Sequence, residues 1–286
     1  MQDLSLLRSM LFTPSDRPDR FAKAAGSGAD GAILDLEDGV GLPAKAKARD
    51  AALAFFAAPG AAAHNFVWAL RLNHVTTRSG LEDLLVFGSA QIKPGILLLP
   101  KTESVAEIEV ALRHLGDATS QPTIVALIES GRGLDAATAI AAHPAVAALA
   151  FGGADLAADL NAELAWEPML FARSRIVQAA AAAGIAAWDV PFLDIHDAAG
   201  LAAETAAAKA LGYVCKLAIH PGQVGAINTA FSPSPALIDK ARRIVAAFEA
   251  AGGGACQVDG KMVDVPVVKA ARRTVMLAKA MGEHAA

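Results

Sequence analysis

The sequence predicts an α/β fold, a closed TIM (β/α)8 barrel with a C-terminal helical extension that carries a lid. Eight apolar, strand-like runs alternate with helix-like segments, which is the pattern of parallel strands joined by crossover helices. Polar residues gather directly after several of these runs, as they do at the functional face of a barrel. The length of 286 residues fits one barrel of about 250 residues plus an appendage. An open doubly wound sheet is the alternative, but it usually has a glycine-rich turn after its first strand, and Thr13-Pro14-Ser15-Asp16 is not one.

The expected strands are spaced so that a helix fits between each pair. They cover residues 9–12, 32–36, 66–72, 95–99, 123–128, 147–151, 186–190 and 214–219. Prolines mark plausible helix starts, such as Pro18 before residues 20–23 and Pro168 before residues 169–183. We expect the catalytic barrel to span residues 1–232 and the extension to span residues 233–286.

After the eighth strand the chain reads as mostly helical. Helices are expected over residues 221–230 and 236–250, and a last one over residues 267–281. Between the last two, Gly252-Gly253-Gly254 is expected to form a hinge before the segment 258–264. The residues beyond the barrel could fold over its mouth, or over the mouth of a neighbouring subunit.

Composition argues against several classes of partner. A net charge of -4 and the lack of lysine and arginine runs indicate neither nucleic acid nor a membrane surface as a partner. Cys215 and Cys256 lie far apart with no second pair, which argues against a zinc site or a disulfide framework. The N-terminal segment Met1-Gln2-Asp3-Leu4 lacks the pattern of a secretory signal, so we expect a cytoplasmic protein that binds a small molecule.

Four carboxylates are expected at one mouth of the barrel. Glu37 and Asp38 follow the second strand, Glu129 follows the fifth, and Asp155 follows the sixth. Carboxylates from neighbouring strand ends suit Mg²⁺, which prefers a pair of them together with water and substrate oxygens. The competing interpretation is that Glu129 caps the helix starting near Gly131 while Asp155 caps a turn.

Cationic residues are expected around the same mouth. Arg71 and Lys101 end the third and fourth strands, and either could neutralise the acids or contact substrate. The planar guanidinium of Arg71 suits a carboxylate or a developing enolate oxygen. Arg17 and Lys23 belong to a small basic patch after the first strand, which could meet phosphate or be an ordinary helix start. His220 after the eighth strand could act as acid or base but also suits a helix entry, and we do not expect it to be catalytic.

Taken together, the motifs resemble those of a known family. They are Arg8-Ser9-Met10-Leu11-Phe12-Thr13-Pro14, Arg17-Pro18-Asp19-Arg20, Ser27-Gly28-Ala29-Asp30, Asp35-Leu36-Glu37-Asp38, Arg71-Leu72-Asn73, Leu99-Pro100-Lys101, Leu127-Ile128-Glu129-Ser130, Gly153-Ala154-Asp155-Leu156, Ile219-His220-Pro221-Gly222-Gln223-Val224 and Asp259-Gly260-Lys261-Met262-Val263-Asp264-Val265-Pro266. The chain resembles the citrate lyase β-subunit-like branch of the HpcH/HpaI aldolase family over nearly its whole length. Gly39 departs from the pattern, since alanine commonly follows the Glu-Asp pair.

The resemblance implies a specific chemistry. It implies a TIM barrel, Mg²⁺ held by Glu129 and Asp155, Arg71 at the reacting end of the substrate, and a coenzyme A or acyl-carrier thioester as substrate. The family's catalytic aspartate falls on Asp264, whose competing role is a helix N-cap. We expect Asp264 to close over a mouth in a homo-oligomer, a trimer or a hexamer.

The expected reaction is cleavage or formation of a malyl-, citramalyl- or citryl-type β-hydroxyacyl thioester, giving an acyl thioester and a 2-oxo acid. Alternatives are an aldolase acting on free 2-oxo acids, and a subunit that binds a carrier protein within a larger lyase complex. Arg71, Glu37, Asp38, Arg17, Lys23 and Lys101 are the expected substrate-binding residues.

Overall fold

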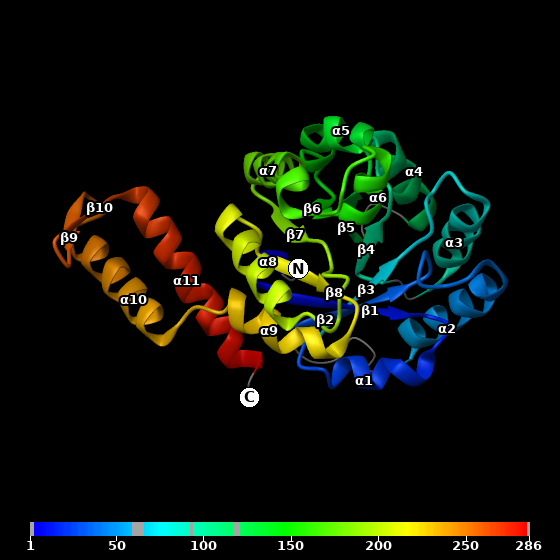
Figure 1. The fold of residues 1–286 in the computed structure, drawn as a ribbon, viewed down its shortest axis with the longest axis horizontal. Coiled ribbons are helices and arrows are strands. Elements are labelled where there is room, and N and C mark those ends of the chain that lie inside the picture. The colour runs from blue at the N-terminus through cyan, green and yellow to red at the C-terminus, as the bar shows by residue number, and fades with distance from the viewer. Residues whose placement is uncertain (1–2, 59–65, 92–93, 117–120, 285–286) are drawn as a thin grey trace. The chain divides into compact units, whose positions relative to one another are not determined.

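A computed structural model describes residues 3–58, 66–91, 94–116 and 121–284 (Figure 1). Met1 and Gln2, the first residues of the N-terminal segment that lacks a secretory pattern, lie outside the described residues. The chain divides into two compact units, Met1–Asn228 and Thr229–Ala286. The functional division after residue 232, with a catalytic barrel before it and a lid after it, stays a proposal.

The first unit is a closed parallel barrel, which confirms the predicted fold class (Figure 1). Each strand pairs with the next along the chain, and β8 returns to pair with β1, where Leu217 lies opposite Met10. The predicted strands differ from the observed ones by at most two residues at either end. The strands are β1 (Ser9–Pro14), β2 (Gly31–Asp35), β3 (Val67–Arg71), β4 (Ile96–Leu99), β5 (Thr123–Ile128), β6 (Val146–Phe151), β7 (Ala186–Asp189) and β8 (Cys215–Ala218).

Helices connect the strands and cover the outside of the barrel (Figure 1). Their starts follow local capping chemistry: Thr77 accepts the Gly80 N–H, and Asp197 accepts the Gly200 N–H. Pro168 lies in the first turn of α7, where a missing N–H leaves no helix bond unmade. The segments are η1 (Leu4–Leu6), η2 (Pro18–Arg20), α1 (Phe21–Ala25), η3 (Leu42–Ala44), α2 (Lys45–Ala57), α3 (Arg78–Ser89), α4 (Val105–Leu115), α5 (Gly131–Ala141), α6 (Gly153–Asp159), α7 (Trp166–Ala183), α8 (Ala198–Leu211) and α9 (Pro221–Phe231).

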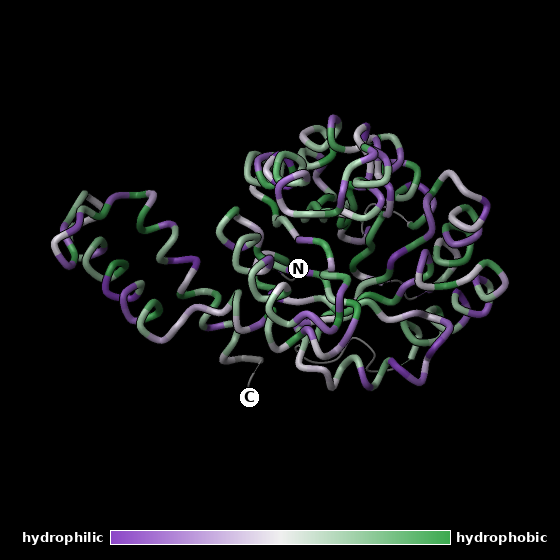
Figure 2. Tube along the Cα trace, in the orientation of Figure 1, coloured by the Kyte–Doolittle hydropathy of each residue, from purple (hydrophilic) through white to green (hydrophobic). Residues whose placement is uncertain are grey.

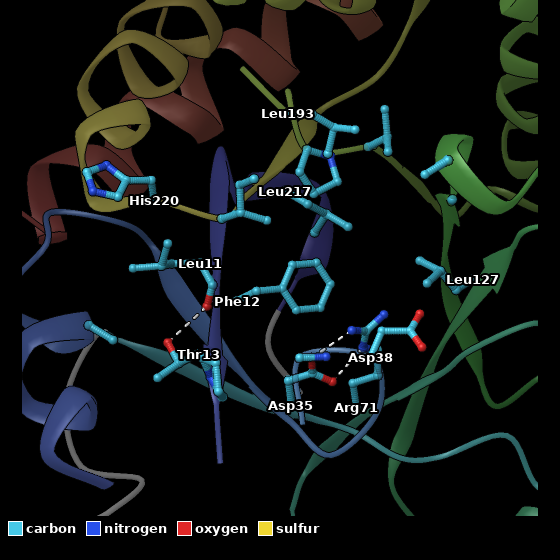
Figure 3. A pocket seen from close by; sticks show the side chains of 18 of the residues that line it. Leu11, Phe12, Thr13, Asp35, Asp38, Arg71, Leu127, Leu193, Leu217 and His220 are labelled. Atoms are coloured by element: carbon cyan, nitrogen blue, oxygen red, sulfur yellow. Dashed lines mark hydrogen bonds and ion pairs between the residues drawn. The ribbon is translucent and has the colours of Figure 1, made fainter. Parts of the chain in front are cut away.

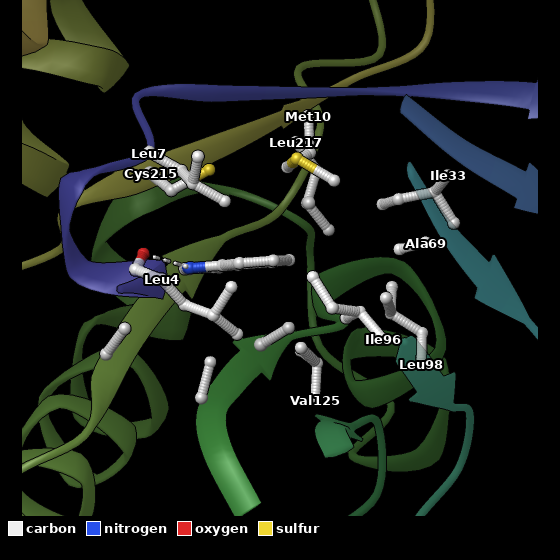
Figure 4. Packing of buried hydrophobic residues seen from close by; sticks show 14 of the residues in the cluster. Leu4, Leu7, Met10, Ile33, Ala69, Ile96, Leu98, Val125, Cys215 and Leu217 are labelled. Atoms are coloured by element: carbon white, nitrogen blue, oxygen red, sulfur yellow. Dashed lines mark hydrogen bonds between the residues drawn. The ribbon is translucent and has the colours of Figure 1, made fainter. Parts of the chain in front are cut away.

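The barrel interior is filled by apolar side chains from alternate strand positions (Figure 4). Trp188 is fully buried there, and its indole N–H donates to the Leu4 carbonyl at 3.4 Å, which ties η1 to the barrel. Met10, Ile33 and Leu217 pack in the same cluster. The strands therefore carry mostly hydrophobic residues, whereas the surrounding helices mix both kinds (Figure 2). This filled interior leaves the carboxyl ends of the strands as the place for polar chemistry.

A group of four charged side chains lies between β7, β8 and the outer helices α7 and α8. Asp189 and Lys216 are register partners, and Lys216 Nζ lies 2.5 Å from Asp189 Oδ2 and 2.7 Å from Glu204 Oε1. Arg173 Nε lies 3.2 Å from Asp189 Oδ1. Removing one member would leave a buried charge without its partner, which is strongly destabilising. Asp189 and Lys216 are therefore structural residues that join the helices to the barrel.

In its described part, the second unit contains the end of α9, two further helices and a hairpin. α10 (Pro235–Ala250) and α11 (Val265–His284) are joined by β9 (Cys256–Val258) and β10 (Lys261–Val263), which pair antiparallel. The hairpin was not predicted, because strands of three residues give almost no periodic signal. Gly252 and Gly253 adopt φ of 67° and 82° and end α10, where only glycine adopts such angles easily. The core of this unit comprises Ala241, Ile244, Phe248, Val263, Val268 and Ala271.

Among the described residues, no helix is both long and apolar enough to cross a lipid bilayer.

Candidate active site

A pocket of about 760 Å³ opens at the carboxyl ends of the barrel strands (Figure 3). Its wall combines charged residues with an apolar side formed by Phe12, Leu127, Val190, Leu193 and Leu217. Most of the predicted site residues line this pocket, and they come from segments far apart in the sequence. The predicted residues in its wall are Arg17, Lys23, Asp38, Arg71, Glu129 and Asp155.

Arg71 is held at the end of β3 by its register partner Asp35 in β2 (Figure 3). Arg71 Nε and Nη2 each lie 2.7 Å from an Asp35 carboxylate oxygen, and the guanidinium carbon lies 4.6 Å from the centre of the Phe12 ring. Burial lowers the pKa of Arg71, but the hydrogen bonds and charge of Asp35, with Glu37, outweigh burial and raise that pKa. The bidentate face of Arg71 therefore binds Asp35, and only its other N–H groups remain for a substrate oxygen.

Asp35 was not among the predicted site residues, although it belongs to one of the recognised motifs. Besides Arg71, its carboxylate accepts the backbone N–H groups of Glu37 and Gly39, both at 2.9 Å. A Cβ on Gly39 would lie 2.4 Å from Asp35 Oδ2, so glycine leaves the space that this carboxylate occupies. Asp35 thereby fixes both Arg71 and the loop that carries Glu37 and Asp38.

Glu37 is buried between two cations. Its Oε2 lies 2.8 Å from Arg71 Nη1, an ion pair without hydrogen-bond geometry, and its Oε1 accepts a hydrogen bond from Lys101 Nζ. Burial raises the pKa of Glu37, and the charge of Arg71 opposes that shift. Glu37 therefore lies behind the pocket wall and supports Arg71 and Lys101.

Lys101 occupies the turn after β4 with a left-handed φ of 50°. Besides Glu37, its ammonium lies 3.3 Å from Asp38 Oδ2 and 3.3 Å from Asp155 Oδ2. Burial lowers the pKa of Lys101, but the hydrogen bond and charge of Glu37 outweigh it and hold that pKa well above its ordinary value. Lys101 is therefore a fixed positive charge surrounded by carboxylates.

Glu129 follows β5 and is 7% exposed. Its Oε2 accepts the Lys101 backbone N–H at 2.7 Å. Burial, followed by the charge of Glu37, raises the pKa of Glu129 to about 8. A Cβ on Gly152 would lie 2.2 Å from Glu129 Cγ, so the glycine before α6 makes room for this side chain. Ser130 accepts the Gly133 N–H at the start of α5, so the interpretation of Glu129 as the cap of that helix is wrong.

Asp155 lies in the first turn of α6, directly after β6, and adds to the negative charge that raises the pKa of Glu129. Among the described residues, no group of three or more His, Cys, Asp or Glu side chains is arranged as a metal-ligand set. Mg²⁺ does not need such a set, since it usually takes one or two carboxylates and completes its shell with water and substrate oxygens. Glu129 and Asp155 fit that requirement, because a buried carboxylate with a raised pKa lacks a counter-charge that a cation would supply.

The rim of the pocket carries the basic patch predicted after β1. Arg17 is paired with Asp19, with Nε and Nη2 each 3.0 Å from a carboxylate oxygen. Arg20 and Lys23 line the pocket from η2 and α1. His220 also lines it, and its Nδ1 accepts the Gly222 N–H at 3.1 Å, which agrees with the helix-entry role.

Asp264 lies in the second unit, at the start of α11. Its Oδ1 accepts the Val267 N–H at 3.4 Å, so the N-cap role is present in this structure. Its catalytic role stays a prediction.

The comparisons agree with the geometry. The chain is 31% identical to the human mitochondrial citramalyl-CoA lyase, covering 96% of this chain and 86% of that protein. It is 34% identical to a (3S)-malyl-CoA thioesterase of Cereibacter sphaeroides, covering 96% and 95% of the two chains. Its structure resembles CitE from Mycobacterium tuberculosis in complex with magnesium, acetoacetate and coenzyme A, with a TM-score of 0.77, 34% identity, and coverage of 95% and 97%. The model of the HpcH/HpaI aldolase/citrate lyase family matches residues 8–221, so the resemblance predicted from the motifs is confirmed and the chain belongs to that family of lyases.

Proposed function

We propose that this protein is a Mg²⁺-dependent carbon-carbon lyase that cleaves, or forms, a β-hydroxyacyl thioester of the malyl, citramalyl or citryl type. The observation that carries the proposal is the placement of Arg71, Glu129 and Asp155 in one pocket, with Glu129 buried and its pKa raised to about 8. Support also comes from the name of the human relative, a citramalyl-CoA lyase, and from the magnesium and coenzyme A in the similar CitE structure. The products would be an acyl thioester and a 2-oxo acid.

The pocket residues account for metal binding and for stabilisation of the enolate in such a cleavage. Glu129 and Asp155 would hold Mg²⁺, which when bound supplies a Lewis acid for the oxygens of the 2-oxo acid portion. A base removes the β-hydroxyl proton, the carbon-carbon bond breaks, and its electron pair passes to the thioester fragment as an enolate. The N–H groups of Arg71 that do not bind Asp35 would stabilise the enolate oxygen, while Asp35 holds the guanidinium in place. A proton delivered to the α-carbon then completes the acyl thioester.

Three further roles complete the proposal. Asp264 would exchange the proton of the substrate hydroxyl or of the acyl α-carbon. It would reach the pocket of a neighbouring subunit, in a homotrimer or a hexamer. The protein would act in the cytoplasm. The basic rim at Arg17, Arg20 and Lys23 would bind the phosphates of coenzyme A or of an acyl-carrier arm, since guanidinium and ammonium groups suit phosphate. Asp38 lines the pocket and would border the acyl portion, with Lys101 paired to it.

The test is a product assay on the purified full-length chain. Malyl-, citramalyl- and citryl-CoA are incubated with the protein and MgCl₂, and 2-oxo acid is measured separately from free thiol. We expect glyoxylate, pyruvate or oxaloacetate without an equal amount of free coenzyme A. Free thiol without 2-oxo acid would instead establish hydrolysis, the activity named for the Cereibacter relative. Cleavage of free 2-oxo acid aldols alone would favour the aldolase alternative, and no turnover without a carrier protein would favour the subunit alternative.

A further inference from the structure

One residue contacts both proposed magnesium ligands. The backbone N–H of Lys101 donates to Glu129 Oε2 at 2.7 Å, and its Nζ lies 3.3 Å from Asp155 Oδ2. The contact to Glu129 is made by the main chain and would survive a side-chain substitution. The contact to Asp155 depends on the ammonium group, so substitution separates the two.

The ammonium of Lys101 occupies a cluster with excess negative charge. Arg71 offers Glu37 only its Nη1, because Asp35 takes the other face of the guanidinium. Lys45 Nζ binds the carbonyl oxygens of Leu36 and Glu37 at 2.7 and 2.6 Å. Lys101 is thus the cation that joins Glu37 to Asp38 and Asp155. The three cations of this cluster are Arg71, Lys45 and Lys101. Its five carboxylates are Asp35, Glu37, Asp38, Glu129 and Asp155. With Glu129 ionised, the negative charges exceed the positive charges by two, which equals the charge of one Mg²⁺.

We propose that Lys101 is a positioning residue whose ammonium is the resident counter-charge of Asp155 in the metal-free protein and competes there with the divalent cation. When metal binds, the ammonium gives up Asp155 and keeps Glu37 and Asp38, which lie on the β2 side of the site. Lys101 would therefore keep Asp155 ordered and the cluster folded in the metal-free protein, at the cost of weaker metal binding. This inference rests on the metal site of the proposed function.

The test compares Mn²⁺ affinity and thermal stability of the wild-type chain with Lys101→Met. Mn²⁺ is the probe, and its dissociation constant is measured by calorimetry and by electron paramagnetic resonance. We expect Lys101→Met to bind Mn²⁺ at least about fivefold more tightly, because a like charge next to the site is gone. We also expect a lower melting temperature without metal and a larger rise on adding Mn²⁺ than in wild type.

Two further variants control for misfolding and for general electrostatic effects. Lys101→Gln keeps a side chain that can hydrogen-bond Glu37 but has no charge, so it should show the same tighter binding even if Lys101→Met does not fold. Lys23→Met removes a positive charge from the rim of the same pocket. Its effect on Mn²⁺ affinity therefore measures how much of the change at Lys101 comes from long-range electrostatics alone. We expect that effect to be less than half of the effect at Lys101.

Unchanged or weaker Mn²⁺ binding in both Lys101 variants would overturn the competition. An equal gain in Lys23→Met would overturn it too, because general electrostatics would then account for the result. A wild-type chain that binds no Mn²⁺, while still cleaving a thioester, would overturn both the metal site and this inference. A chain that binds Mn²⁺ as expected but cleaves no thioester would overturn the proposed reaction and leave the role of Lys101 standing.

Discussion

Magnesium binding to this protein should release a proton at neutral pH, and the proton should come from Glu129. The pKa of this carboxyl is raised to about 8 by burial and by the charge of Glu37, whereas Mg²⁺ requires the carboxylate. At pH 7 about nine-tenths of the metal-free molecules therefore carry this proton. Removing it costs about 1.4 kcal/mol at pH 7, so the apparent affinity should be about tenfold below its limit at high pH.

The assay is calorimetric titration of the protein with MgCl₂ at pH 7 in two buffers of different ionisation enthalpy. The difference in heat gives the number of protons released, which should be about 0.9 per Mg²⁺. The dissociation constant should fall about ninefold from pH 6 to pH 7 and about fivefold from pH 7 to pH 8, and it should level off above pH 8. The same raised pKa means that the Glu129 proton stabilises the metal-free fold fully below pH 4.5 and that this contribution is lost as pH rises through about 8.

Two variants test whether the released proton comes from Glu129. Glu129→Gln should bind Mg²⁺ weakly and release no proton, because an amide does not titrate in this range. Glu37→Gln removes a negative neighbour and should lower the pKa of Glu129, which moves the proton-release curve to lower pH. Binding at pH 7 without proton release, together with an affinity that stays flat from pH 6 to pH 8, would refute the reasoning.

Three other outcomes are expected from substitutions at single positions. Arg71→Lys should lose turnover by at least about tenfold in steady-state assays, because a single ammonium cannot keep the two bonds to Asp35 and also face the substrate; near-parental turnover would remove Arg71 from the site. Asp264→Asn should lose at least about a hundredfold in turnover while Mg²⁺ and thioester binding persist, since asparagine still caps α11 but cannot exchange a proton, and full activity would exclude it as the base. Gly152→Ala should weaken Mg²⁺ binding with no charge removed, because the new methyl group would displace Glu129, and an unchanged calorimetric affinity would show that the site adjusts.

The sequence alone determined the barrel and the shared mouth of its candidate functional residues. Strand-like runs and their polar ends were enough, because parallel strands in a closed barrel must place their carboxyl ends on one face. Glu129, Asp155 and Arg71 could therefore be assigned to one face without knowing any contact. The motifs predicted the family, and the match of the family model to residues 8–221 confirmed it.

The tertiary structure alone decided which groups are paired and which remain available. Asp35 and Arg71 are 36 positions apart, and only the register of β2 against β3 places them side by side. The space that Gly152 leaves for Glu129, and the burial that raises the pKa of Glu129, depend on neighbours from other strands. Such terms are invisible in the sequence, because pairing and desolvation are properties of packed surfaces that distant segments form together.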